Sequence, residues 1–182
     1  IPPAFKLTHH CHPRDLDIVL DAMGFNKEME TYVQTKALPF PSDNGGKLSA
    51  RISTEMDQEW IDAYSKLGMF ESLTLQCRLE IINRIESMKG FARVEAQGEI
   101  IGIGMGVLQD EMLGLFGIVT EPMYRRKGVG MSVNAALMDW GKCNGAKTAY
   151  LQVEKQNKPA IALYAKCGFE ICYDYWYRIL RS

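Results

Sequence analysis

The chain has 182 residues, of which 47% are hydrophobic and 24% charged, a balance typical of a globular protein with one substantial core. The formal net charge is −1, which argues against a protein that coats nucleic acid or a membrane surface. No run of about 20 apolar residues predicts a membrane span, and the first residues do not resemble a signal segment. We therefore expect a cytoplasmic protein without nucleic-acid or membrane partners.

The predicted elements begin with a short front segment that resembles a later part of the chain. Residues 7–33 can be laid on residues 151–177 without a gap, so that Leu7 falls on Leu151 and Gly24 falls on Gly168. Identities are few, and any strand–helix–glycine–strand unit has this outline, so chance similarity is the alternative to a true repeat. We expect residues 30–35 to form a strand that adds to the edge of the main sheet.

A stretch rich in proline, glycine and turn-forming residues follows, with the sequence PFPSDNGG over residues 39–46. Such composition predicts an exposed, irregular linker. We therefore divide the chain into a front segment (1–38), a linker (39–46) and a main domain (47–182).

The main domain alternates between strand and helix patterns. Apolar residues recur at helical spacing over residues 57–67 and 72–86, and Asn-Gly or glycine ends two further predicted helices. The predicted elements are a strand (47–53), two helices (57–67 and 72–86), a hairpin of strands (91–96 and 99–108) turning at Gln97-Gly98, a strand (112–120), a helix (128–143), a strand (148–153), a helix (158–167) and two short aromatic strands (169–172 and 174–180).

The cysteine and histidine residues do not predict a metal site. The five cysteines form no Cys-x-x-Cys pair, so free thiols in a reducing compartment are the simplest interpretation. His9, His10, Cys11 and His12 form a short cluster beside Pro13, but no second group of ligands accompanies them. We expect no bound metal.

The strongest local motif runs from Ile118 to Met131, with the sequence IVTEPMYRRKGVGM. A strand ends at a proline turn, and a basic loop with glycines then opens a helix. Free N–H groups and the helix dipole favour an anion at such a position, and glycine lets the backbone approach it closely. The motif is neither a Walker loop nor the three-glycine dinucleotide fingerprint. It predicts pyrophosphate binding, with a solvated glycine turn as the alternative.

Two motifs together resemble the GNAT superfamily of N-acetyltransferases. Arg125-x-x-Gly128-x-Gly130 is similar to the acetyl-CoA loop of that family, and the stretch from Leu151 through Asn157 and Tyr164 to Gly168-Phe169 is similar to its later strand–Asn–helix–Gly-Phe segment. The aromatic end of the chain fits the last strand of the family. The resemblance covers roughly residues 47–180.

The resemblance implies an α/β fold with a mixed, mostly antiparallel sheet flanked by helices. The strands at 112–120 and 148–153 would be one parallel pair that splays to admit pantetheine. The implied activity is transfer of acetyl from acetyl-CoA to a primary amine of a small molecule or peptide, by direct attack in a ternary complex. The chain would thus be a bacterial, cytoplasmic acyltransferase, and a homodimer is one possible assembly.

The resemblance also assigns roles to individual residues. Asn157 would hydrogen-bond the cofactor near its amide groups, and Tyr164 would protonate the departing thiolate. The alternatives are an N-cap for Asn157 and a core tyrosine for Tyr164. The strand residues that would face the pantetheine and the acetyl carbonyl are Ile118, Val119 and Thr120. The residues that would surround the pyrophosphate are Arg125, Arg126, Lys127, Gly128, Val129, Gly130 and Met131.

The general base is ambiguous in the sequence. A lysine-like amine has a pKa near ~10.4, so it must lose a proton before it attacks. Gln152 stands where some relatives carry a glutamate, and a neutral amide cannot accept that proton. Glu154 on the same strand face and Glu121 at the end of the cofactor strand are candidate bases acting through water. The alternatives are that both are surface carboxylates and that the reaction has no direct base.

Other interpretations remain open. The missing glutamate keeps a non-catalytic acyl-CoA-binding sensor or regulatory module as the alternative function, and an interaction domain as a further one. Trp60, Tyr64 and Phe70 are candidates for the edge of the acceptor site. The front segment resembles the closing half of a second, degenerate GNAT lobe, which we expect to be silent because Leu20 stands in the place of Tyr164 and Pro13 in that of Asn157.

Overall fold

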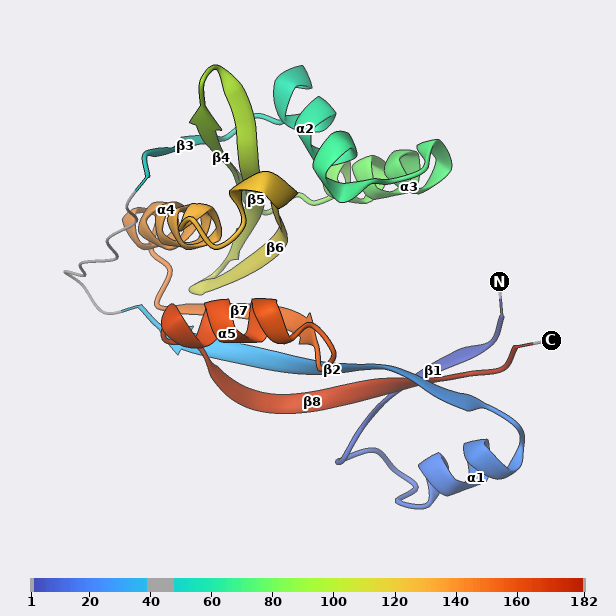
Figure 1. Cartoon of the computed structure of the whole chain (residues 1–182). Helices are drawn as coiled ribbons and strands as arrows, with labels where there is room; N and C mark the ends of the chain where they lie inside the picture. The colour runs from blue at the N-terminus through green and yellow to red at the C-terminus, as the bar shows by residue number, and fades with distance from the viewer. Residues whose placement is uncertain (1, 39–47, 182) are drawn as a thin grey trace. The chain divides into compact units, whose positions relative to one another are not determined.

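The computed structural model describes residues 2–38 and 48–181 (Figure 1). The predicted linker therefore lies outside the described residues. The chain forms two compact units, one made of residues 1–35 and 151–182 and the other of residues 36–150. The division into a front segment, a linker and a main domain stays a prediction.

Over residues 48–150, the second unit contains four whole strands and most of the helices. Its elements are β3 (Ala50–Ser53), α2 (Gln58–Gly68), α3 (Ser72–Asn83), β4 (Met88–Ala96), β5 (Glu99–Gln109), β6 (Met112–Thr120), a 3-10 turn (Pro122–Tyr124) and α4 (Val129–Cys143). The strands pair in the order β3-β4-β5-β6, and every pair is antiparallel. The hairpin between β4 and β5 turns at Gln97 and Gly98, as predicted, with φ values of 54° and 81°.

The first unit contains two strand–helix–strand segments. They are β1 (Ala4–Thr8), α1 (Leu16–Ala22) and β2 (Asn26–Ala37), then β7 (Thr148–Glu154), α5 (Lys158–Lys166) and β8 (Glu170–Ile179). β8 pairs antiparallel with both β1 and β2. β2 and β7 both continue across the boundary, since residues 36–37 and 148–150 belong to the second unit.

The start of β7 supplies the predicted parallel pair within the second unit. The N–H groups of Lys147 and Thr148 both donate to the carbonyl of Glu111, at 2.8 and 3.1 Å, just where β6 begins. Residues 148–150 therefore lie beside β6 and run in its direction. The mixed, mostly antiparallel sheet with flanking helices confirms the predicted fold class, and the opening of a slot for pantetheine stays a prediction.

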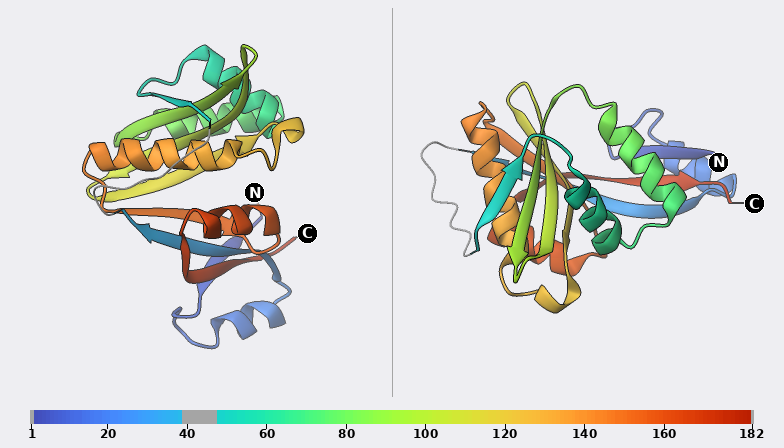
Figure 2. Two further views of the ribbon diagram at one scale, coloured as in Figure 1. Left: turned by 60° about the vertical axis from the view of Figure 1, so that its left-hand side comes forward. Right: turned by 90° about the horizontal axis from the view of Figure 1, so that it is seen from above.

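The two faces of β5 differ in side-chain size, and this difference positions the helices of the second unit. Figure 2 shows the orange α4 on one side of these strands and the green α2 and α3 on the other. Gly102, Gly104 and Gly106 face α4, and a Cβ atom on Gly104 would lie only 2.6 Å from the Cγ1 atom of Val133. The absence of side chains at these positions lets α4 pack close to the sheet. Because α4 begins at the predicted cofactor loop, its packing also fixes that loop.

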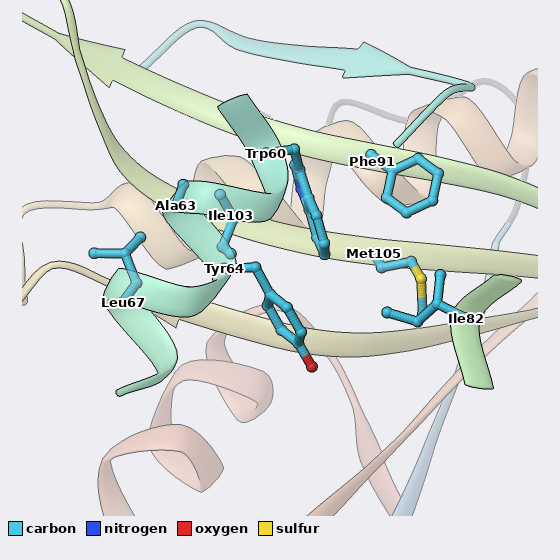
Figure 3. Packing of buried hydrophobic residues seen from close by; sticks show 8 residues of the cluster. All are labelled: Trp60, Ala63, Tyr64, Leu67, Ile82, Phe91, Ile103 and Met105. Atoms are coloured by element: carbon cyan, nitrogen blue, oxygen red, sulfur yellow. The ribbon is translucent and has the colours of Figure 1, made fainter. Parts of the chain in front are cut away.

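The opposite face of β5 carries Ile103 and Met105, which pack against α2 and α3 (Figure 3). Asp57 caps α2 by accepting a hydrogen bond from the backbone N–H of Trp60 at 2.8 Å, and the indole of Trp60 donates to the carbonyl of Ala92 at 3.1 Å. These bonds satisfy polar groups at the base of an apolar cluster. The remaining labelled members of the cluster are Ala63, Tyr64, Leu67, Ile82 and Phe91.

Some predicted boundaries were wrong. The chain from residue 170 to 179 is one strand rather than two, because Tyr173 and Asp174 stay in the ladder opposite Val33 and Tyr32. β2 pairs with β8 and neighbours β7, so the front strand lies inside the sheet of the first unit rather than at an edge.

Other boundaries also differ from the prediction, among them the start of β4 at Met88 rather than residue 91. α3 ends at Asn83 rather than residue 86, and the Lys89 amino group donates to the carbonyls of Ile82 and Ile85 at its end. β3 begins at Ala50 rather than residue 47. In α3, the helical spacing of apolar residues continues past Asn83, where the helix stops.

Candidate active site

The predicted cofactor strand, β6, contains a bulge. Val119 pairs with Ile103 and Phe116 pairs with Met105, so Gly117 and Ile118 together lie opposite a single residue of β5. Gly117 has a φ of 57°, a left-handed conformation that glycine adopts without strain. A bulge takes backbone groups out of the regular ladder and redirects the strand. Ile118 lies in this bulge, and Val119 and Thr120 follow it in the ladder with β5.

The loop after β6 is rich in hydrogen-bond donors without acceptors. Arg126 and Gly128 have φ values of 63° and 90°, and α4 starts at Val129 without a side-chain cap. The first backbone N–H of α4 with an acceptor is that of Ser132, which donates to the carbonyl of Gly128 at 3.0 Å. Within the described parts of the chain, the N–H groups from Arg126 to Met131 have no acceptor. Left-handed turns of this kind gather N–H groups into an anion-binding concavity.

The charges in the loop have the sign that an anion requires. Arg125, Arg126 and Lys127 are exposed, and among residues 2–38 and 48–181 no acidic side chain forms an ion pair with them. The Lys127 amino group lies 5.1 Å from the centre of the Tyr124 ring. The loop therefore combines three cationic side chains with the unpaired N–H groups of a helix start.

Asn157 and Tyr164 belong to the first unit. Asn157 caps α5, since its Oδ1 atom accepts from the backbone N–H of Ala160 at 3.2 Å. This bond leaves the amide NH₂ group able to donate elsewhere, so the N-cap and cofactor roles are compatible. Tyr164 is buried, and burial raises the pKa of its phenol to about 12. A protonated phenol is the form that a general acid needs.

The candidate bases lie in different units. On β7, Gln152 and Glu154 are exposed on one face while Leu151 and Val153 are buried on the other. The Oε1 atom of Gln152 accepts a hydrogen bond from the hydroxyl of Tyr175 at 2.6 Å. Glu121 follows β6 directly in the second unit. The structure thus brings Glu121 together with the cofactor strand and loop, and it places Glu154 with Asn157 and Tyr164.

The sequence analysis missed a cavity of about 320 Å³ between α2, α3, β5 and β6. Trp60 and Tyr64, predicted to edge the acceptor site, line it together with Arg78 and Gly117. Phe70 lies behind this lining, with its ring 4.9 Å from that of Tyr64. Glycine beside an aromatic residue was the only sequence signal for the bulge, and helical spacing gave no reason to single out Arg78.

His9 and Cys11 of the front cluster have other partners. His9 Nε2 lies 3.2 Å from a carboxylate oxygen of Asp174, and the thiol of Cys11 accepts from the backbone N–H of Thr8 at 3.2 Å. Across the described residues, no group of three or more potential metal ligands occurs. No helix in that part of the chain is long and apolar enough to span a membrane.

Comparison with known proteins relates this geometry to one family. The sequence profile of the acetyltransferase (GNAT) family matches residues 51–169. An uncharacterized N-acetyltransferase of Bacillus subtilis, YobR, is 28% identical over 184 residues, which cover all of this chain and 74% of YobR.

Solved structures show the same fold. A GCN5-related N-acetyltransferase from Sphaerobacter thermophilus superimposes with a TM-score of 0.70 at 15% identity, covering 100% of this chain and 61% of that one. AAC(6')-Iy, solved with the bisubstrate analogue CoA-S-monomethyl-acetylneamine, gives 0.55 at 19% identity, covering 67% and 91%. The chain with the bulged strand and the basic helix-opening loop belongs to the GNAT family and is an acyltransferase.

Proposed function

We propose that this protein is a cytoplasmic N-acetyltransferase that moves an acetyl group from acetyl-CoA to a primary amine in a ternary complex. The observation that carries the proposal is the loop from Arg125 to Met131, in which the backbone N–H groups from Arg126 onward lack acceptors and three side chains are cationic. A pyrophosphate matches both features. The CoA-containing analogue bound by AAC(6')-Iy supports the same class of donor.

The chemistry assigns a task to the bulged strand. The amine nitrogen attacks the thioester carbon, and the carbonyl oxygen becomes an oxyanion. Backbone N–H groups near Ile118, Val119 and Thr120 would bind the pantetheine and stabilise that oxygen as its charge develops. Asn157 would add a hydrogen bond to the cofactor. Binding both substrates together removes much of the entropic barrier.

Two proton transfers complete the reaction. When the C–S bond breaks, the protonated phenol of Tyr164 would give its proton to the departing thiolate. The attacking nitrogen must lose a proton, and the neutral Gln152 cannot take it. We assign this step to Glu121 or Glu154 through a water molecule, with deprotonation in solution as the alternative route. Replacing each glutamate with glutamine distinguishes the three by the pH profile of kcat/KM.

The proposed donor site is tested by calorimetric titration with acetyl-CoA, with Gly128→Glu as the variant. The substitution puts a carboxylate into the anion site and a side chain at a φ of 90°, so we expect binding to weaken by at least about 10-fold. Gly98→Glu is the matched control, because Gly98 also has a positive φ, of 81°, and open space around it. Equal affinity in both variants contradicts the assignment.

The same preparation separates an enzyme from a sensor. Release of CoA with an amine acceptor, measured with a thiol reagent, is expected for an N-acetyltransferase. Binding of acetyl-CoA without CoA release for any amine class would instead identify the acyl-CoA-binding regulatory module.

A further inference from the structure

The cavity beside β6 has a mostly apolar wall with a single cation. Trp60, Tyr64, Ile82 and Met105 form buried parts of the wall, with exposed fractions between 1% and 6%. A volume of about 320 Å³ is at the small end of the range for sites that bind small molecules. Its size fits one side chain or one small amine rather than a large oligosaccharide.

Arg78 supplies the charge at this cavity. Its Nη1 atom donates a hydrogen bond to the Tyr64 hydroxyl at 3.4 Å, and its guanidinium lies 4.4 Å from the centre of the Phe70 ring. Among the residues that the structure describes, no carboxylate pairs with Arg78, and the cavity lining includes no acidic residue. Figure 3 shows the Tyr64 hydroxyl directed away from Trp60, at the margin of the apolar cluster. The guanidinium and this hydroxyl together provide several donors for an anionic group.

The cavity also reaches the bulge of the cofactor strand. Gly117 is part of its lining, and a Cβ atom on Gly117 would lie 3.8 Å from the Tyr64 hydroxyl oxygen. One hydroxyl group therefore separates the Arg78 guanidinium from the strand position next to Ile118. A short acceptor molecule bound at Arg78 would therefore be long enough to bring its amine to the acetyl carbonyl proposed to lie beside this strand.

We propose that the acceptor is an apolar amino acid, that is, a small molecule with a primary amine, a hydrocarbon or aromatic side chain and a free carboxylate. The carboxylate pairs with Arg78, and the side chain occupies the apolar wall. The inference rests on the proposed acetyl transfer to an amine. A polyamine or aminoglycoside needs carboxylates around it, and this lining offers a cation instead. A peptide acceptor has no free carboxylate beside its terminal amine.

A panel of acceptors tests this proposal with saturating acetyl-CoA and product detection by mass spectrometry. The panel contains L-phenylalanine, L-leucine, L-phenylalaninamide, a tripeptide with N-terminal phenylalanine, spermidine and an aminoglycoside. We expect the two amino acids to have the highest kcat/KM. Higher kcat/KM for spermidine, the aminoglycoside or the tripeptide overturns the proposal while acetyl transfer itself stands. Absence of acetyl-CoA binding in calorimetry overturns both.

Variants of Arg78 locate the carboxylate. We expect Arg78→Gln to raise the KM for L-phenylalanine by about 10-fold to 100-fold and to leave that for L-phenylalaninamide nearly unchanged. Arg78→Lys should recover part of the loss, since it keeps the charge. Arg84→Gln is the matched control, because Arg84 is exposed just after the same helix and outside the cavity lining. An equal effect of Arg78→Gln on the acid and the amide contradicts the assigned contact.

Discussion

The first unit contains two strand–helix–strand segments, β1–α1–β2 and β7–α5–β8, whose elements occur at matching positions. Each helix is followed by a left-handed glycine, Gly24 with a φ of 85° and Gly168 with a φ of 82°. After each glycine a buried phenylalanine donates from its backbone N–H to a helix carbonyl at 3.0 Å, Phe25 to Leu20 and Phe169 to Tyr164. The two turns therefore have the same hydrogen bonds and the same backbone conformation.

The pairing of β2 with β8 shows the same equivalence. Asn26 lies opposite Ile179 at one end of the ladder, and Thr35 lies opposite Glu170 at the other. In the alignment of the two segments, Asn26 corresponds to Glu170 and Thr35 corresponds to Ile179. Exchanging the segments therefore converts the first pair into the second. Thr31 and Tyr175, which correspond to each other, are paired directly. This two-fold relation supports the prediction that residues 1–38 repeat the end of the chain.

The segments differ at the side chains with proposed roles. Leu20 occupies the position of Tyr164, and both are buried. α5 has an N-cap side chain, Asn157, whereas α1 has no side-chain cap hydrogen bond. The turn is the same with either side chain, so the backbone geometry does not depend on the tyrosine. The conformation of this turn therefore does not require the phenol hydroxyl of Tyr164.

The largest expected effect tests whether both turns belong to the core. Phe25→Ala and Phe169→Ala each remove a side chain that is at most 6% exposed, so each should lower the free energy of unfolding by about 3–5 kcal/mol. Urea unfolding followed by circular dichroism measures the loss. Phe5→Ala is the control, because Phe5 is 45% exposed and its loss should be much smaller. A small loss for only one of the two phenylalanines breaks the equivalence.

The next effect separates the segments by chemistry. Tyr164→Phe should lower kcat by about 100-fold or more and leave the affinity for acetyl-CoA unchanged, because only the proton donor is lost. Leu20→Met at the matching position should leave kcat unchanged. Burial raises the pKa of Tyr164 to about 12. A loss of activity on raising the pH, with an apparent pKa well below that value, would therefore assign the general acid to another group. A steady-state CoA-release assay across pH distinguishes these outcomes.

The smallest effect sharpens the comparison of the turns. Gly24→Ala and Gly168→Ala place a Cβ atom in the left-handed region, which should cost about 1–2 kcal/mol at each site. A Cβ atom on Gly24 would have only an ordinary contact, 3.9 Å from a methyl carbon of Leu180, so the cost is conformational. Thermal and urea unfolding should give similar losses for the two variants. A stabilised Gly24→Ala variant would show that the front turn does not need this conformation.

Sequence patterns predicted the elements and the loop better than the pairing. The strand from residue 112 to 120 and the loop that opens α4 were predicted correctly because their signals are local: apolar residues, a proline turn and glycines. The single strand β8 and the interior position of β2 were missed, because each depends on partner strands far away in the chain. The bulge at Gly117 was missed for the same reason, since it depends on the register between β5 and β6.

The sequence by itself determined the family, the basic loop proposed to bind an anion and the glycine turns, because φ preferences, helix caps and short hydrogen bonds act between neighbouring residues. Only the tertiary structure decided that Tyr164 is buried, that Gln152 accepts a hydrogen bond from Tyr175, and that Arg78 meets Tyr64 at an apolar cavity. Those features arise from packing between segments distant in sequence, where burial and shape set the chemistry of a side chain.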